Sequence, residues 1–223
     1  KKTNMKFSII TVFALLCTSV FAQISEGGIP LSKELTTKHG LYLTETIINY
    51  EIPKPDLEKI KSEDLENDFN GQKYRVGTNI DLNLNLNDGD WEIVGNHEIW
   101  RLKISSADAI ALGLYFSEEV EIFENGKLFV YNENKKQILG AYTKNTPHFE
   151  AIEMVQGDVL TLEYSAPIGN KRPNIAIKQL VYFYRGVEDH ISEYIDYPEN
   201  YMETRAASCQ VDVACTPESN GWA

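Results

Sequence analysis

The chain has 223 residues, and its 33 acidic against 21 basic residues give a formal net charge of −12. Hydrophobic residues make up 43% and charged residues 24%, which is typical of a globular protein and argues against a largely disordered chain. The acidic balance argues against a nucleic-acid partner, because neutralising phosphates requires clustered Lys and Arg. The length suits one full-sized domain with additional segments at either end.

The first 22 residues are typical of a signal peptide. Lysines precede an uncharged, mostly apolar run from Phe7 to Phe21, which is shorter than the roughly 20 residues that span a bilayer as a helix. We therefore expect cleavage between Ala22 and Gln23, a secreted product (extracellular or periplasmic) and no membrane attachment afterwards. A membrane anchor is the alternative. Cleavage would remove Cys17 from the product.

Residues 23–52 show little periodicity and are interpreted as an extended leader. A domain is expected over residues 53–186, opened by one short amphipathic helix at residues 56–70. This helix is predicted from apolar residues that recur at near-helical spacing among acids and lysines, and Asn70-Gly71 ends the run. These apolar residues are Leu57, Ile60, Leu65 and Phe69.

Residues 74–186 have the patterns of β-strands. In residues 97–104 the side chains alternate, with Trp100, Leu102 and Ile104 on one face, and residues 160–164 alternate in the same way. Turn signals separate such runs at Asp88-Gly89, Asn125-Gly126 and Gly157-Asp158. About nine or ten short strands predict an all-β domain, an antiparallel and jelly-roll-like β-sandwich.

The motifs of catalysis and metal binding are not recognisable in this stretch. The four histidines, His39, His97, His148 and His190, have no second ligand at metal-site spacing, and nucleophile elbows and phosphate loops are missing. We therefore expect no catalytic residue, no metal and no cofactor here.

Three weaker patterns have a structural interpretation. Residues 83–90 resemble a calcium loop, but a strand with leucines inward and asparagines outward fits better. Glu118, Glu119 and Glu121 could supply a carboxylate pair, although a solvated strand edge is the simpler interpretation. Four aromatic residues could form a sugar-stacking platform, although their alternation favours core packing. They are Trp91, Trp100, Tyr115 and Tyr131.

Residues 187–205 are rich in acids and tyrosines and are interpreted as an exposed linker. Beyond them come Cys209 and Cys215, which in an exported protein indicate disulfide chemistry at the carboxyl end.

The segment from Ser208 to Trp222 resembles the opening of the mature catalytic domain of bacterial lysyl-endopeptidase-type, chymotrypsin-like serine proteases. The spacing of Cys209, Cys215 and Trp222 carries this resemblance. Weaker landmarks similar to the propeptide of such precursors follow in the same order upstream. They are Pro55–Leu57, Asn70-Gly71, Tyr74–Gly77, Trp91, Trp100–Leu102, Leu128–Asn132, Leu139–Ala141, Gly157-Asp158, Leu162–Tyr164 and Tyr184–Gly186.

The resemblance implies a truncated precursor: a signal peptide, a propeptide and, in residues 206–223, the start of a trypsin-like protease domain. The partner of the propeptide would be that domain, which it would help to fold and keep latent. The catalytic triad would lie beyond Ala223, and Cys209 and Cys215 would pair with cysteines further along.

Arg205-Ala206 is the candidate processing bond. No Lys follows Lys178, which leaves lysine specificity and autoprocessing open. The alternative to the precursor is a stand-alone secreted β-sandwich that binds carbohydrate or a cell surface.

Overall fold

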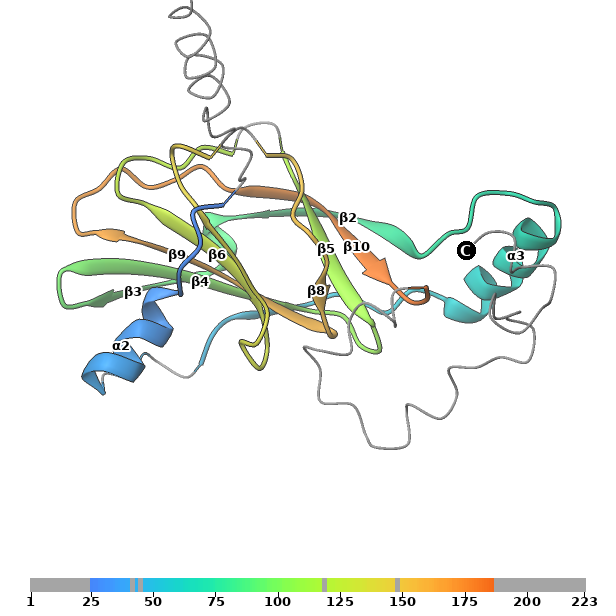
Figure 1. The fold of residues 1–223 in the computed structure, drawn as a ribbon, viewed down its shortest axis with the longest axis horizontal. Coiled ribbons are helices and arrows are strands. Elements are labelled where there is room, and N and C mark those ends of the chain that lie inside the picture. The colour runs from blue at the N-terminus through green and yellow to red at the C-terminus, as the bar shows by residue number, and fades with distance from the viewer. Residues whose placement is uncertain (1–24, 41–42, 44–45, 118–119, 147–148, 187–223) are drawn as a thin grey trace, which may run out of the picture.

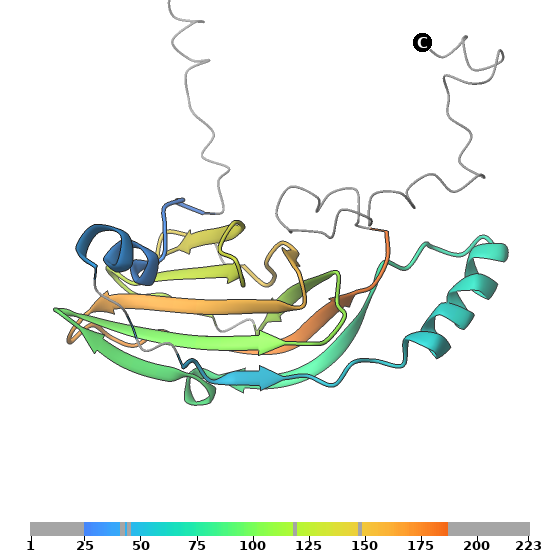
Figure 2. The ribbon, with the colours of Figure 1, turned by 90° about the horizontal axis from the view of Figure 1, so that it is seen from below.

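The computed structural model describes residues 25–40, 43, 46–117, 120–146 and 149–186. In this part of the chain two β-sheets face each other and two short helices lie outside them (Figures 1 and 2). The all-β prediction is confirmed. The strands are β1 (Asn49–Glu51), β2 (Gly77–Asn85), β3 (Asp90–Val94), β4 (His97–Ser105), β5 (Ala111–Phe116), β6 (Lys127–Asn132), β7 (Ile138–Tyr142), β8 (Val155–Gln156), β9 (Val159–Pro167) and β10 (Ala176–Phe183).

The larger sheet has the order β1-β4-β9-β6-β7, with β3 also paired to β4, and the smaller has the order β2-β10-β5-β8. These pairs are antiparallel except for β1, which runs parallel to β4 with Tyr50 opposite Ile104. A purely antiparallel domain was expected. β1 can pair with β4 because β3 covers only residues 97–101 of that strand and leaves the rest of the same edge open.

The predicted alternation of the strands is confirmed by the core between the sheets. Trp100, Leu102 and Ile104 of β4 are fully buried there, and the Trp100 indole N–H donates to the carbonyl of Leu86 at 3.0 Å. The smaller sheet contributes alternate residues of β5 and β10 to the same apolar cluster. Because one face of every long strand is buried, the register of both sheets is strongly specified.

The expectation of an extended leader over residues 23–52 is wrong for its centre, where helix α2 (Leu31–His39) forms. Pro30 precedes the helix, and Gly40 ends it in the left-handed region with φ 59°. Ahead of it, the chain extends the edge of β7, since Glu26 N–H donates to the carbonyl of Ala141 at 2.9 Å. Polar contacts with the outer face of the larger sheet stabilise α2, although its sequence shows only weak helical periodicity.

Helix α3 (Leu57–Phe69) confirms the helix predicted at residues 56–70. The Asp56 side chain caps its first turn by accepting from the Lys59 N–H at 3.1 Å, and Asn70 is its C-cap. The helix projects beyond the end of the two sheets (Figures 1 and 2). Among the described residues, neither helix has the length and apolarity needed to cross a bilayer.

Candidate functional site

The processing and disulfide residues predicted from the sequence cannot be placed in this fold. Ala22, Gln23, Arg205, Ala206, Cys209 and Cys215 lie outside the described residues, as do Glu118 and Glu119. Within the described part of the chain, no group of three or more His, Cys, Asp or Glu could hold a metal ion.

The four aromatic residues considered as a sugar platform do not lie on one surface. Trp100 is buried between the sheets, whereas Tyr131 is buried on the outer face of the larger sheet. Tyr115 belongs to the smaller sheet, and Trp91 packs edge-on against Tyr164 with ring centroids 6.2 Å apart. Core packing, the simpler interpretation, is confirmed for Trp100.

An ion-pair cluster joins α3 to one end of the smaller sheet, where β2 begins and the neighbouring strand β10 ends, and we call it the α3 clasp: Asp64, Asp68, Arg75, Tyr184 and Arg185. The Asp64 carboxylate, only 2% exposed, accepts from Arg75 Nε at 2.8 Å and from the Tyr184 hydroxyl at 2.7 Å. Arg185 donates to Asp68 at 2.8 Å and to the carbonyl of Arg75 at 2.7 Å.

Charges in the clasp compensate one another. Burial alone would raise the pKa of Asp64, but the hydrogen bonds from Tyr184 and Arg75 and the charge of Arg185 lower it below its ordinary value. The hydrogen bond to Asp68 raises the pKa of Arg185. The carboxylate therefore stays ionised although it is buried, and it holds two arginines from different strand ends.

Two landmarks of the family resemblance meet in this clasp. Tyr74–Gly77 leads into β2 and Tyr184–Gly186 follows β10, and Arg75 and Arg185 from these two runs both contact Asp64. Sequence reasoning missed the cluster. The sequence did contain one sign of it. Asp64 is a charged residue at the position where the helical spacing of Leu57 and Ile60 predicts an inward-facing side chain.

Two of the four apolar residues from which α3 was predicted do not face the core. Leu57 and Ile60 pack against the core, as expected for the apolar stripe of an amphipathic helix. However, Leu65 is 75% and Phe69 91% exposed. These two residues lie one helical turn apart, on a different face from Ile60 and Asp64, because each residue turns the helix by about 100°.

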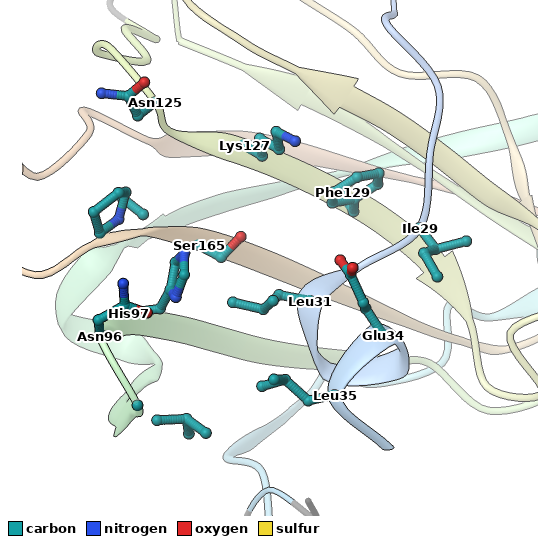
Figure 3. Close-up of a pocket in the computed structure, with 14 residues that line it drawn as sticks. Ile29, Leu31, Glu34, Leu35, Asn96, His97, Asn125, Lys127, Phe129 and Ser165 are labelled. Atoms are coloured by element: carbon teal, nitrogen blue, oxygen red, sulfur yellow. The ribbon is translucent and has the colours of Figure 1, made fainter. Parts of the chain in front are cut away.

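A second candidate is a groove of about 610 Å³ beside α2 (Figure 3). Leu31, Glu34 and Leu35 of α2 line one side, and Lys127 and Phe129 of β6 line the other. His97 and Ser165 also line it, but no hydrogen bond joins them. The lining of the groove is therefore a mixture of polar and apolar side chains.

Under α2 a buried carboxylate ties the helix to the sheet. Glu163, fully buried, accepts from the Tyr131 hydroxyl at 2.9 Å and from Ser32. Burial and the neighbouring carboxylate raise the pKa of Tyr131 far above its ordinary value. Tyr131 is thus a neutral donor to Glu163, and the cluster fixes α2 on the larger sheet.

Comparison with known proteins found no family model that matches the chain and no curated protein that matches it.

Proposed function

We propose that this chain is the amino-terminal part of the precursor of a secreted, trypsin-like serine endopeptidase. Residues 53–186 would be its propeptide, a jelly-roll-like β-sandwich, and residues 206–223 the start of the catalytic domain. The resemblance of residues 208–222 to the opening of such domains supports this assignment. The alternative, a stand-alone binding module, is considered below.

One structural observation carries the proposal: the last described strand, β10, is held in the interior of its sheet. β10 lies between β2 and β5 inside the smaller sheet, and Tyr184 and Arg185 immediately after it are bound to α3. An interior last strand whose end is anchored suits a propeptide, which is expected to fold before the chain that follows.

The proposed role follows from folding physics. Chymotrypsin-like β-barrels have many contacts between residues distant in sequence, so they fold slowly and expose strand edges meanwhile. A prefolded body that binds their near-native state stabilises it by mass action. This chain supplies no catalytic residue in the proposal, since the triad would lie beyond Ala223.

Processing of the precursor tests the proposal. The complete precursor should release an active enzyme whose amino terminus is Ala206, and Arg205→Gln should abolish or shift that cut. Arg172→Gln, which changes an exposed arginine far along the chain from the junction, is the matched control and should be processed normally. An active enzyme that still begins at Gln23 would contradict the assignment, as would downstream sequence without His, Asp and Ser in triad order.

The groove beside α2 is the observation that would favour a secreted binding module instead. Its mixed polar and apolar lining could hold a small polar ligand such as a glycan. Glycan-array binding by the 223-residue chain, lost on Lys127→Ala and kept on Lys171→Ala, would support this second candidate.

A further inference from the structure

The groove beside α2 has polar side chains from three neighbouring strands on its sheet side. His97 of β4 lies opposite Pro167 of β9. Ser165, two residues before Pro167, lies opposite Lys127 of β6. Residues two apart on a strand share a face, and directly paired residues face the same side of the sheet. His97, Ser165 and Lys127 are therefore neighbours on the outer face of the larger sheet, where all three line the groove.

Ser165 supplies an unused hydrogen-bonding group in this groove. The residue is only 6% exposed, and its hydroxyl has no hydrogen-bond partner within the part of the chain that the structure describes. Polar groups of largely buried residues are normally hydrogen-bonded, because losing water without gaining a new partner costs free energy. Ser165 lies on the groove side of β9 (Figure 3), so a group bound in the groove can accept a hydrogen bond from its hydroxyl.

The charge of the groove is opposite in sign to that of the whole chain. Lys127, which lines the groove, is exposed and has no ion pair with a described residue. Among the described residues in the lining, the one acid is Glu34 of α2, and it is bound to Lys38 at 2.7 Å. An unpaired ammonium thus lines the groove on a chain of formal net charge −12, and it attracts anions there.

One ammonium and one hydroxyl fit a carboxylate better than a phosphate. Directly opposite residues in antiparallel strands have Cβ atoms about 5 Å apart, so Lys127 and Ser165 can both reach one carboxylate group. A carboxylate carries a single charge, which one ammonium neutralises and a hydroxyl donor stabilises further. Phosphate groups carry up to two charges and are commonly bound by Arg clusters, whereas the described lining of this groove contains no Arg.

Apolar side chains complete the lining and indicate the rest of the ligand. Leu31 and Leu35 lie one turn apart on α2, and Phe129 lies two residues beyond Lys127 on the same face of β6. The volume of the groove, about 610 Å³, is in the range of pockets that hold small molecules. The fitting ligand is therefore small, with a carboxylate at one end and an apolar body.

We propose that the groove beside α2 binds a small organic carboxylate with an apolar body. Lys127 pairs with the carboxylate, and Ser165 donates a hydrogen bond to it. Leu31, Leu35 and Phe129 contact the apolar part. The site consists of described residues alone, so the inference goes beyond the precursor assignment and stands without it. It differs from the glycan site of the second candidate because it requires a negative charge on the ligand.

Calorimetric titration of the 223-residue chain with benzoate and hexanoate, up to about 10 mM, tests the site. At least one acid should bind saturably, and its neutral amide, benzamide or hexanamide, should bind about tenfold more weakly because it lacks the charge that Lys127 pairs with. Lys127→Ala should weaken binding of the acid about tenfold, and Ser165→Ala about fivefold. Lys171→Ala and Ser62→Ala change exposed residues outside the groove, and these matched controls should bind as wild type.

Three results would overturn the inference: no saturable binding of either acid, amides that bind as tightly as the acids, or binding that Lys127→Ala and Ser165→Ala leave unchanged. A neutral glycan that binds while the acids do not would also overturn it, in favour of the second candidate. Because Lys127 is exposed, Lys127→Ala should keep the thermal midpoint of wild type and decides the question even if Ser165→Ala is less stable. Processing at Arg205-Ala206 is measured separately, so neither result alters the other.

Discussion

The carboxylate of Glu163 accepts hydrogen bonds from both the backbone N–H and the hydroxyl of Ser32, at 2.9 and 2.6 Å, across 131 residues of sequence. Ser32 is in the first turn of α2, where backbone N–H groups have no partner within the helix. Glu163 of β9 therefore accepts a hydrogen bond from a backbone N–H that has no partner within the helix. In turn, this hydrogen bond replaces water around the buried carboxylate. This contact explains how a helix with little apolar surface is held on the outer face of the larger sheet.

Glu163→Gln should destabilise the protein by about 2 kcal/mol, because a charged acceptor of three hydrogen bonds is replaced by a neutral amide. Urea unfolding measures the loss, and hydrogen exchange should rise selectively in residues 31–39. The matched control, Glu150→Gln, changes an exposed acid and should stay within about 0.5 kcal/mol of wild type. Combined with Ser32→Ala, Glu163→Gln should show a coupling energy of about 1 kcal/mol, and additive effects would refute the direct contact.

Asp64→Asn should destabilise the protein by about 3 kcal/mol at neutral pH, because it leaves Arg75 and Arg185 without their shared buried anion. The folded-state pKa of Asp64 is lowered, so its contribution is fully present above the unfolded value, about 3.9, and is lost as the pH falls through the folded value. The stability difference between wild type and variant should thus be constant above about pH 5 and shrink below about pH 4.

Urea unfolding at several pH values measures this difference. Asp81→Asn, an exposed acid on β2, is the control and should change stability by less than about 0.5 kcal/mol. A wild-type-to-variant difference that grows as the pH falls would contradict the assigned sign.

Gly89→Ala should cost about 2 kcal/mol through overpacking alone. A Cβ at this position would lie 2.6 Å from both the Trp100 indole nitrogen and the carbonyl of Arg101, although the backbone, with φ −120°, suits any residue. Gly95→Ala is the informative comparison, because it meets no atom within 4 Å but has φ 62° and should cost about 1 kcal/mol. Equal effects in thermal unfolding would mean that the Trp100 contact is relaxed elsewhere.

Truncation after Gly186 should leave the free energy of unfolding within about 0.5 kcal/mol of the 223-residue chain, since it keeps β10, Tyr184 and Arg185 with their contacts to α3. Truncation after Phe183 removes Tyr184 and Arg185, two partners of Asp64, and should cost about 3 kcal/mol. Urea unfolding of the two fragments measures the contrast. Similar stability of both would show that the α3 clasp contributes little.

Much of the fold could be predicted from alternation and turn residues. The face of β4 that carries Trp100 and the turn at Asn125-Gly126 before β6 were both identified, because each depends on a few neighbouring residues. The helix at residues 56–70 was predicted for the same reason. Local patterns determine these elements, so the sequence alone was sufficient to predict them.

The contacts between distant segments could not be predicted. Glu163 alternates with apolar residues exactly as a solvent-facing acid would, and only its cover, α2, makes it a buried anchor. Helix α2 was missed in turn, since its stability comes from that anchor, and the signals at Pro30 and Gly40 were the only local ones. The same holds for Asp64, whose two arginines come from strands at opposite ends of the domain sequence.

The α3 clasp also has a mechanical consequence. Tension applied to the chain beyond Gly186 reaches Arg185 and Tyr184 before it reaches the ladder of β10, so the ion pairs with Asp64 and Asp68 bear the first load. A pull on this end of the chain would then strain α3 before it peels a central strand from its sheet. We therefore expect the clasp to bear such a load before the interior of the smaller sheet does.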